Sequence, residues 1–210
     1  MSNLGSRLAQ AGRRSEALTA TEQAVKILRR LTVDNPAAYE PNLAGSLSNL
    51  GNRLAEVGRG SEALAATGEA AGIYQRLAAD NPAVYEPNLA GSLSNLGIQL
   101  AEAGRRSEAL TATEQAVEIR RRLTAVNPAA YEPNLANSLS NLGIQLAQAG
   151  RRSEALTATE QAVEIQRRLT AVNPAAYEPN LANSLSNLGI QLAQAGRRSE
   201  ALTATEQAVE

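Results

Sequence analysis

One short segment recurs along the chain at a constant spacing, and this repetition limits the possible folds more than any other feature. The tetrapeptide Ser-Asn-Leu-Gly begins at residues 2, 48, 94, 140 and 186, always 46 residues apart. Residues 94–139 and 140–185 differ only at Glu102/Gln148 and Arg120/Gln166. We therefore expect a single array of one repeated unit, truncated in its first and last helix pairs. The approximate repeats are 2–47, 48–93, 94–139, 140–185 and 186–210.

Each repeat carries two apolar stripes with helical spacing. In the third repeat the first stripe predicts a helix A over about 87–103, and the second predicts a helix B over about 108–125. The chain is rich in Ala, Leu and Arg and lacks Phe and Trp, which also favours helix over strand. The stripes are Leu89, Leu93, Leu96, Leu100 and Ala103, then Ala109, Ala112, Ala116, Ile119, Leu123 and Val126.

Residues that start and stop helices agree with these stripes. Pro87 suits the first turn of helix A, and Gly104 suits the left-handed residue after its end. Ser107 is expected to cap helix B, which the Asn127-Pro128 pair should end. The short Gly-Arg-Arg link then makes A and B antiparallel. The longer Asn-Pro-Ala-Ala-Tyr-Glu-Pro link should lead to the next pair, with its tyrosine as a wedge between pairs.

These observations predict an all-α protein. One hairpin of helices A and B cannot bury both of its stripes, but stacked hairpins can. The expected architecture is a right-handed α-solenoid of antiparallel helix pairs with 46-residue repeats.

The composition argues against several classes of function. The chain has no His and no Cys, so it lacks the usual proton-transfer group, the thiol nucleophile and the two best zinc ligands. We expect no enzyme activity, no metal and no cofactor, since no phosphate-binding glycine loop is present either.

Charge and hydropathy narrow the partners further. The 20 basic and 21 acidic residues nearly cancel, which disfavours nucleic acid, and the Arg120-Arg121-Arg122 run is interpreted as solvated surface. No apolar run approaches the length of a membrane span, and no signal-peptide core is present. We expect a cytoplasmic protein without a membrane or nucleic-acid partner.

The repeats resemble the tetratricopeptide repeat along essentially the whole chain. The signature positions of the third repeat are occupied by Leu93, Leu96, Gly97, Leu100, Gly104, Ala109 and Ala116. Leu93, Leu100 and Thr113 replace aromatic residues that are usual in the family, and the unit exceeds its standard 34 residues. Residues 87–97 look similar to the segment that opens helix A in the long repeats of kinesin light chain.

The resemblance implies a scaffold that holds a protein or peptide in a concave groove lined by helix A. The matching positions form a ladder of Asn residues with Ser, Asn and Ile neighbours. Asn side chains can donate to and accept from the peptide groups of an extended ligand, but such a ladder can also bond along the stack or to water. The groove positions are Asn49, Asn95, Asn141, Asn187, Ser94, Ser140, Asn137, Asn183, Asn52, Ile98 and Ile144.

The ends of the chain indicate an alternative function. By repeat alignment the chain enters within a helix A and stops within a helix B, without polar capping helices. Uncapped ends can stack head-to-tail, so a self-assembling structural or designed array is the second hypothesis.

The second repeat departs from the others. Gly60, Gly68 and Gly72 replace charged residues, and the last two lie inside helix B. Because glycine destabilises a helix interior, we predict that this helix B frays first.

Overall fold

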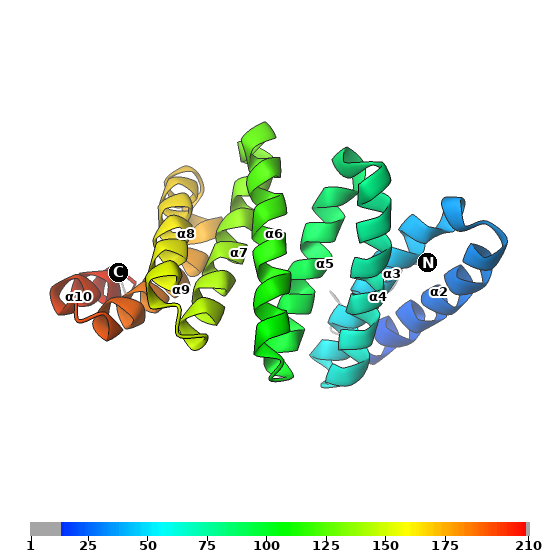
Figure 1. Cartoon of the computed structure of the whole chain (residues 1–210), viewed down its shortest axis with the longest axis horizontal. Helices are drawn as coiled ribbons and strands as arrows, with labels where there is room; N and C mark the ends of the chain where they lie inside the picture. The colour runs from blue at the N-terminus through cyan, green and yellow to red at the C-terminus, as the bar shows by residue number, and fades with distance from the viewer. Residues whose placement is uncertain (1–13, 209–210) are drawn as a thin grey trace. The chain divides into compact units, whose positions relative to one another are not determined.

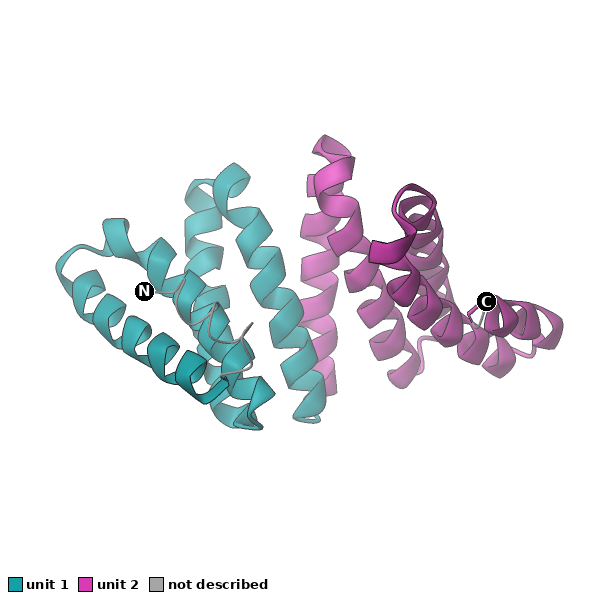
Figure 2. Ribbon diagram, turned by 180° about the vertical axis from the view of Figure 1, so that it is seen from behind, with its two compact units in different colours: residues 1–105 teal, residues 106–210 magenta. Residues whose placement is uncertain are grey.

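The computed structural model describes residues 14–208, in which every regular element is an α-helix. The chain forms two compact units, residues 1–105 and 106–210 (Figure 2), whose helices are labelled in Figure 1. The first unit contains α2 (Arg14–Asp34), α3 (Pro36–Glu56), α4 (Gly60–Asp80) and α5 (Pro82–Glu102). The second contains α6 (Arg106–Val126), α7 (Pro128–Gln148), α8 (Arg152–Val172), α9 (Pro174–Gln194) and α10 (Arg198–Gln207).

Within each unit every helix packs against the next helix in the chain. The helices α3, α5, α7 and α9 correspond to the predicted helix A and are called A helices below. The even-numbered helices correspond to helix B and are called B helices. The predicted all-α class, a solenoid of antiparallel helix pairs, is confirmed.

The A helices begin five residues earlier than the sequence predicts. The helix α5 starts at Pro82, and Pro87 lies inside it, so the expected long link shrinks to Asn81. The prediction was wrong because it treated the second proline as the helix start. Pro82 takes the first helical position, where its missing N–H has no partner to lose. Pro87 lies five residues later, in the second turn, and removes a single backbone bond.

The Asn residue between two helices serves both of them. Asn127 follows the last residue of α6, and its Oδ1 accepts a hydrogen bond from the Ala130 N–H at 3.3 Å at the start of α7. Asn35 and Asn173 make the same bond with Ala38 and Ala176. The predicted stop at Asn127-Pro128 is confirmed, and the same pair also starts the next helix.

The links inside each helix pair end on a left-handed glycine. Gly104 has φ +76°, and Arg105 N–H then bonds the Leu100 carbonyl at 2.8 Å, which closes the end of the A helix as predicted. The predicted Ser107 cap is wrong, because α6 begins at Arg106 and Ser107 lies in its first turn. In α4 and α8 the residue before the helix is Arg59 or Arg151, which makes no side-chain cap bond.

Helices A and B of one pair approach closely through a glycine and a threonine. A Cβ on Gly51 would lie 2.0 Å from Thr67 Oγ1, and one on Gly143 would lie 2.2 Å from Thr159 Oγ1. Thr67 and Thr159 are fully buried, and within the described part of the chain their hydroxyls have no hydrogen-bond partner. This short approach explains why threonine occupies the place of a bulky aromatic residue.

Candidate binding surface

The predicted groove residues lie along one side of the A helices. Asn95 and Ile98 are three residues apart on α5, and Asn141 and Ile144 have the same relation on α7, so each pair shares a helix face. The ladder residues Asn49, Asn95, Asn141 and Asn187 are half-buried. Ile98 and Ile144 keep 39% and 37% of their surface exposed, which is high for isoleucine and leaves apolar area on this side.

In the first unit, part of the ladder bonds along the stack. Asn95 Nδ2 donates to Asn52 Oδ1 at 3.0 Å, which links α5 to α3. Ser48 and Ser92 hydroxyls lie 2.8 Å apart between the same two helices. One donor of the Asn95 amide is therefore already used within the protein, while its other polar groups remain at a half-buried surface.

The second unit has the equivalent serine–serine hydrogen bond, but Asn187 has an isoleucine in place of an asparagine as its neighbour. Ser140 and Ser184 hydroxyls lie 2.7 Å apart between α7 and α9. Ile144 stands at the repeat position of Asn52, so it offers Asn187 no amide partner there. Asn137 and Asn183 are exposed one turn before the ladder. Ser94, in the first unit, donates to the Ala90 carbonyl at 2.9 Å.

The A helices form the inner side of each unit. The helices α3 and α5 contact each other directly, and so do α7 and α9. In the described residues the pairs α2–α4 and α6–α8 show no comparable backbone contact. Each unit therefore brings its ladder residues together on the more tightly packed side.

One ladder residue borders a hollow. A cavity of about 480 Å³ lies between α2 and α3, and Asn49 and Asn42 line it together with Leu28 and Ile27 of the B helix. The sequence reasoning placed the groove on helix A alone and missed the apolar wall from helix B.

The repeat position of Leu28 differs in every repeat. It is occupied by Leu28, Tyr74, Arg120 and Gln166 in α2, α4, α6 and α8. Tyr74 is 5% exposed, its burial raises the pKa of its phenol, and its hydroxyl lies beside Gly45 on α3. Residues 94–139 and 140–185 differ at only two positions, and this is one of them, so the sequence held a signal for its importance.

Arg120 overturns the interpretation of its arginine run as uniform surface. Its Nη1 donates to the Asn134 carbonyl at 2.9 Å and to the Ser138 hydroxyl, and burial lowers the pKa of its guanidinium to about 10. Arg121 and Arg122 are exposed, as predicted, and bond Gln161 and Glu118. The interpretation of all three arginines as solvated surface was wrong, because helical rotation turns one of three consecutive residues inward.

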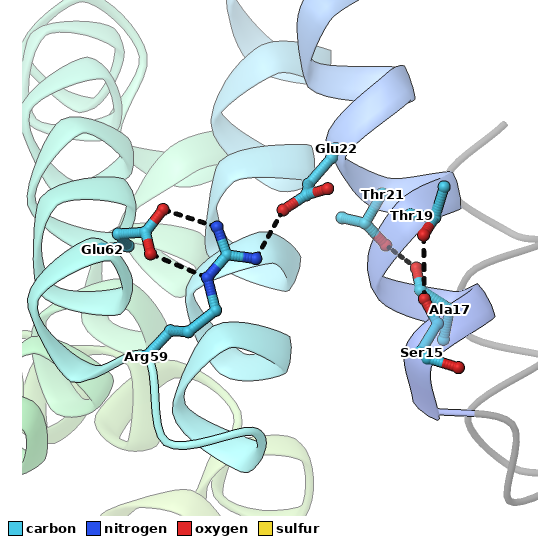
Figure 3. A network of polar contacts seen from close by, with 7 residues as sticks. All are labelled: Ser15, Ala17, Thr19, Thr21, Glu22, Arg59 and Glu62. Atoms are coloured by element: carbon cyan, nitrogen blue, oxygen red, sulfur yellow. Dashed lines mark hydrogen bonds and ion pairs between the residues drawn. The ribbon is translucent and has the colours of Figure 1, made fainter.

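On the B-helix side, arginines connect successive repeats. Arg59 follows α3 and donates to Glu22 of α2 at 2.9 Å and to Glu62 of α4 at 2.6 Å (Figure 3). Thr21 and Thr19 in the same view bond carbonyls of their own helix. Arg59 holds the pKa of Glu62 below its ordinary value. Arg151 repeats the arrangement with Glu114 and Glu154.

The described residues contain no helix with the length and apolarity of a membrane span.

Comparison with known proteins gives one family. The family model described as "Tetratricopeptide repeat" matches residues 1–36, 43–83, 89–124 and 135–170. No curated protein matches the chain.

Solved structures with a similar fold cover nearly the whole chain. The TPR-like repeats of a kinesin light chain candidate from Podosopora anserina are 22% identical with a TM-score of 0.71, covering 99% of this chain and 90% of that one. YrrB, a TPR protein with an unusual peptide-binding site, is 19% identical with a TM-score of 0.60, covering 99% and 82%. MamA from Desulfovibrio magneticus RS-1 is 17% identical with a TM-score of 0.59, covering 99% and 90%. At these identities the likeness shows the fold.

Proposed function

Because the chain belongs to the tetratricopeptide repeat family, we propose that it binds an extended segment of a partner protein along the A-helix ladder. The single observation that carries this proposal is that each unit has half-buried Asn residues beside a partly exposed isoleucine, Ile98 in the first unit and Ile144 in the second. Amides can pair with the peptide groups of a ligand, and isoleucines can cover its apolar side chains. The peptide-binding site of YrrB supports this class of partner.

The two units would contribute different contacts. In the first unit Asn49 lines a hollow with an apolar wall, which suits an apolar side chain of the ligand. In the second unit Asn141 and Asn187 stand beside Ile144 and Ile190, and Ile190 is 58% exposed. The contacts are polar toward the ligand backbone and apolar toward its side chains, without a net charge requirement.

The scaffold needs no catalytic group for this role. The tetratricopeptide repeat is a non-enzymatic scaffold fold, and we propose that this chain acts in the cytoplasm without catalysis, cofactor, nucleic acid or membrane.

A peptide-display selection on the whole chain tests the proposal. Selected peptides should lose at least about tenfold in affinity when Asn95 and Asn141 are both replaced by Ala, because each ligand backbone bond to an amide contributes about 1 kcal/mol. The matched control replaces Gln115 and Gln161, exposed amides on the B helices, and should leave affinity unchanged. Peptides whose binding ignores the Asn variant and falls with the Gln variant would place the site on the opposite side.

Self-assembly is the second candidate function. Leu202 on α10 is 61% exposed, whereas Leu156 at the same repeat position packs against an apolar core. A face of this kind can stack on another repeat. Light scattering across a hundredfold range of concentration distinguishes the two functions, since a head-to-tail array grows in mass with concentration and a monomeric peptide binder does not.

A further inference from the structure

The first unit contains a second cavity, which lies toward the ends of its A helices, beyond the Asn ladder. About 300 Å³ of space lies where the ends of α3 and α5 meet the start of α4. Ala55, Ala63, Leu64 and Ala103 provide apolar walls. Gly60, the first residue of α4, stands at its border and contributes no side chain.

Two polar side chains of α5 line the same cavity. Gln99 is 7% exposed, and its Oε1 accepts no hydrogen bond. Glu102 lies one turn further along the helix, is exposed, and has no ion-pair partner within residues 14–208. The other carboxylates nearby are occupied, since Glu56 pairs with Arg53 at 2.9 Å and Glu62 pairs with Arg59. A buried acceptor and an unpaired carboxylate on an apolar cavity are matched by a ligand that carries hydrogen-bond donors and positive charge.

The second unit has equivalent residues at the corresponding position, but the charged residue there is basic instead of acidic. Gln191 corresponds to Gln99, is 8% exposed, and likewise has an unbonded Oε1. Arg152 replaces Gly60, and Gln194 replaces Glu102. The second unit therefore has a cation where the first has none, and a neutral amide where the first has a carboxylate. Both differences favour a positive group in the first unit over the second.

We propose that this cavity receives a lysine side chain of a partner peptide. The four-carbon stem lies against Ala55, Leu64 and Ala103, and the ammonium group donates to Glu102 beside the Gln99 side chain. The cavity is large enough for one such side chain. This inference rests on the proposed function, because Gln99 and Glu102 lie one and two turns beyond the ladder residue Asn95 on the same helix.

A titration monitored by amide NMR tests the proposal on the whole chain. The probes are the blocked tripeptides acetyl-Ala-Lys-Ala-amide, its norleucine analogue and its arginine analogue. The lysine peptide should shift the backbone amides of Gly60 and Ser61, which are distinguishable because the second repeat is unlike the others in sequence, and the side-chain amide of Gln99 in the third repeat. The norleucine peptide, with a similar stem and no charge, should bind at least about threefold more weakly, as for loss of one exposed ion pair.

Matched variants transfer the differences between the units. Glu102→Gln and Gly60→Arg should each weaken the lysine peptide about two- to fivefold. Both variants should fold, since Gln194 and Arg152 stand at these positions in the second unit, and a Cβ on Gly60 meets nothing within 4 Å. The double variant Arg152→Gly with Gln194→Glu should produce new shifts at Ser153 and the Gln191 amide.

Three outcomes would overturn the proposal: equal binding of the norleucine peptide, preference for the arginine peptide, or shifts that survive in both Glu102→Gln and Gly60→Arg. An Asn49→Ala variant separates this site from the ladder. It should leave the lysine titration unchanged. A failure of the lysine-cavity proposal can therefore be distinguished from a failure of the proposed binding along the ladder.

Discussion

The two units build the same stack of helix pairs from nearly the same sequence, yet they differ on the inner side and in the middle of the B helices. The first unit has the Asn52–Asn95 bond, the buried Tyr74 and a glycine-containing α4. In the second unit, Ile144 corresponds to Asn52, and the buried Gln166 corresponds to Tyr74. The half-buried Arg120 corresponds to Leu28.

What the units share is the contact of glycine with threonine, the left-handed glycine after each A helix, and the Asn cap. These features set the distance and direction of successive helices, so the architecture tolerates variation elsewhere. The comparison teaches that the repeat separates residues that define the scaffold from residues that give each copy its own chemistry.

The largest expected effect comes from the shared contact. Gly51→Ala and Gly143→Ala should each lower the free energy of unfolding by about 1–3 kcal/mol, because the new Cβ would clash with Thr67 or Thr159 and with a helix carbonyl at 3.2 Å. Chemical denaturation measures the loss, which should be similar in the two units. Adding Thr159→Ala to Gly143→Ala should restore part of the stability. A gain in stability from either single variant would show that the helices can separate at little cost.

The next effect concerns the B helices α4 and α8. Gly68→Ala with Gly72→Ala should raise the free energy of unfolding by about 1–2 kcal/mol, since neither Cβ meets an atom within 4 Å and alanine favours helix. In the unmodified protein, amide hydrogen exchange in α4 should be faster than in α8, and the double variant should reduce this difference. Equal protection of both helices before substitution would contradict the expected fraying of α4.

Substitutions of Arg120 and Gln166 sharpen the comparison at the variable position. Arg120→Leu should stabilise the protein by about 1 kcal/mol, because a desolvated cation that has no carboxylate partner among residues 14–208 is replaced by the residue found at position 28. Gln166→Arg should destabilise it by a similar amount. Thermal unfolding of both variants provides the measurement, and a loss of stability in Arg120→Leu would mean that its bonds to Asn134 and Ser138 outweigh its burial.

The hydrogen bond between Asn95 and Asn52 should contribute less to the free energy of unfolding. Asn52→Ile copies the second unit and removes the bond to Asn95, with an expected loss of about 0.5 kcal/mol because water can still reach these half-buried amides. The reciprocal Ile144→Asn should give Asn187 a partner. Denaturation midpoints of the two variants should shift in opposite directions; shifts in the same direction would indicate that side-chain packing, not the amide bond, distinguishes the units.

The smallest effect is expected from the arginines that connect the repeats. Arg59 and Arg151 hold the pKa of Glu62 and Glu154 below the ordinary value of 4.5, so the pairs stabilise the fold above that pH. This contribution is lost as the pH falls through the lowered pKa of each folded glutamate. Arg59→Ala and Arg151→Ala should therefore change stability slightly at pH 7 and not at all near pH 2. An effect that persists at pH 2 would show that the stem of the arginine, not its charge, is important.

Several features of the fold could be predicted from local patterns. The apolar stripes located both helices of each pair, and Gly104 and Asn127 marked their ends, because these residues act through their own backbone conformation or through atoms a few positions away. The start of the A helices was missed because Pro87 is a strong local signal for a first turn. Pro82 carries the same signal. The choice between the two prolines depends on where the preceding B helix ends, and α4 ends at Asp80, directly before Asn81 and Pro82.

The candidate surface also combines features that the sequence predicted with features that it did not. The sequence placed the Asn ladder on a helix face but left open whether it bonds a ligand or its own stack, and the bond of Asn95 to Asn52 joins residues 43 positions apart. Arg120 and Arg121 are adjacent in sequence and differ in burial because α7 covers only one side of α6.

The repeat length, the helical class and the turns followed from the order of residues, since helix periodicity, capping and glycine conformation depend on near neighbours. The partners of Asn95, the burial of Arg120 and the open cavity beside Gln99 depend on which helix lies opposite each side chain. That relation arises only when helices distant in sequence pack together, so tertiary structure alone established which polar groups are satisfied and which remain available to a ligand.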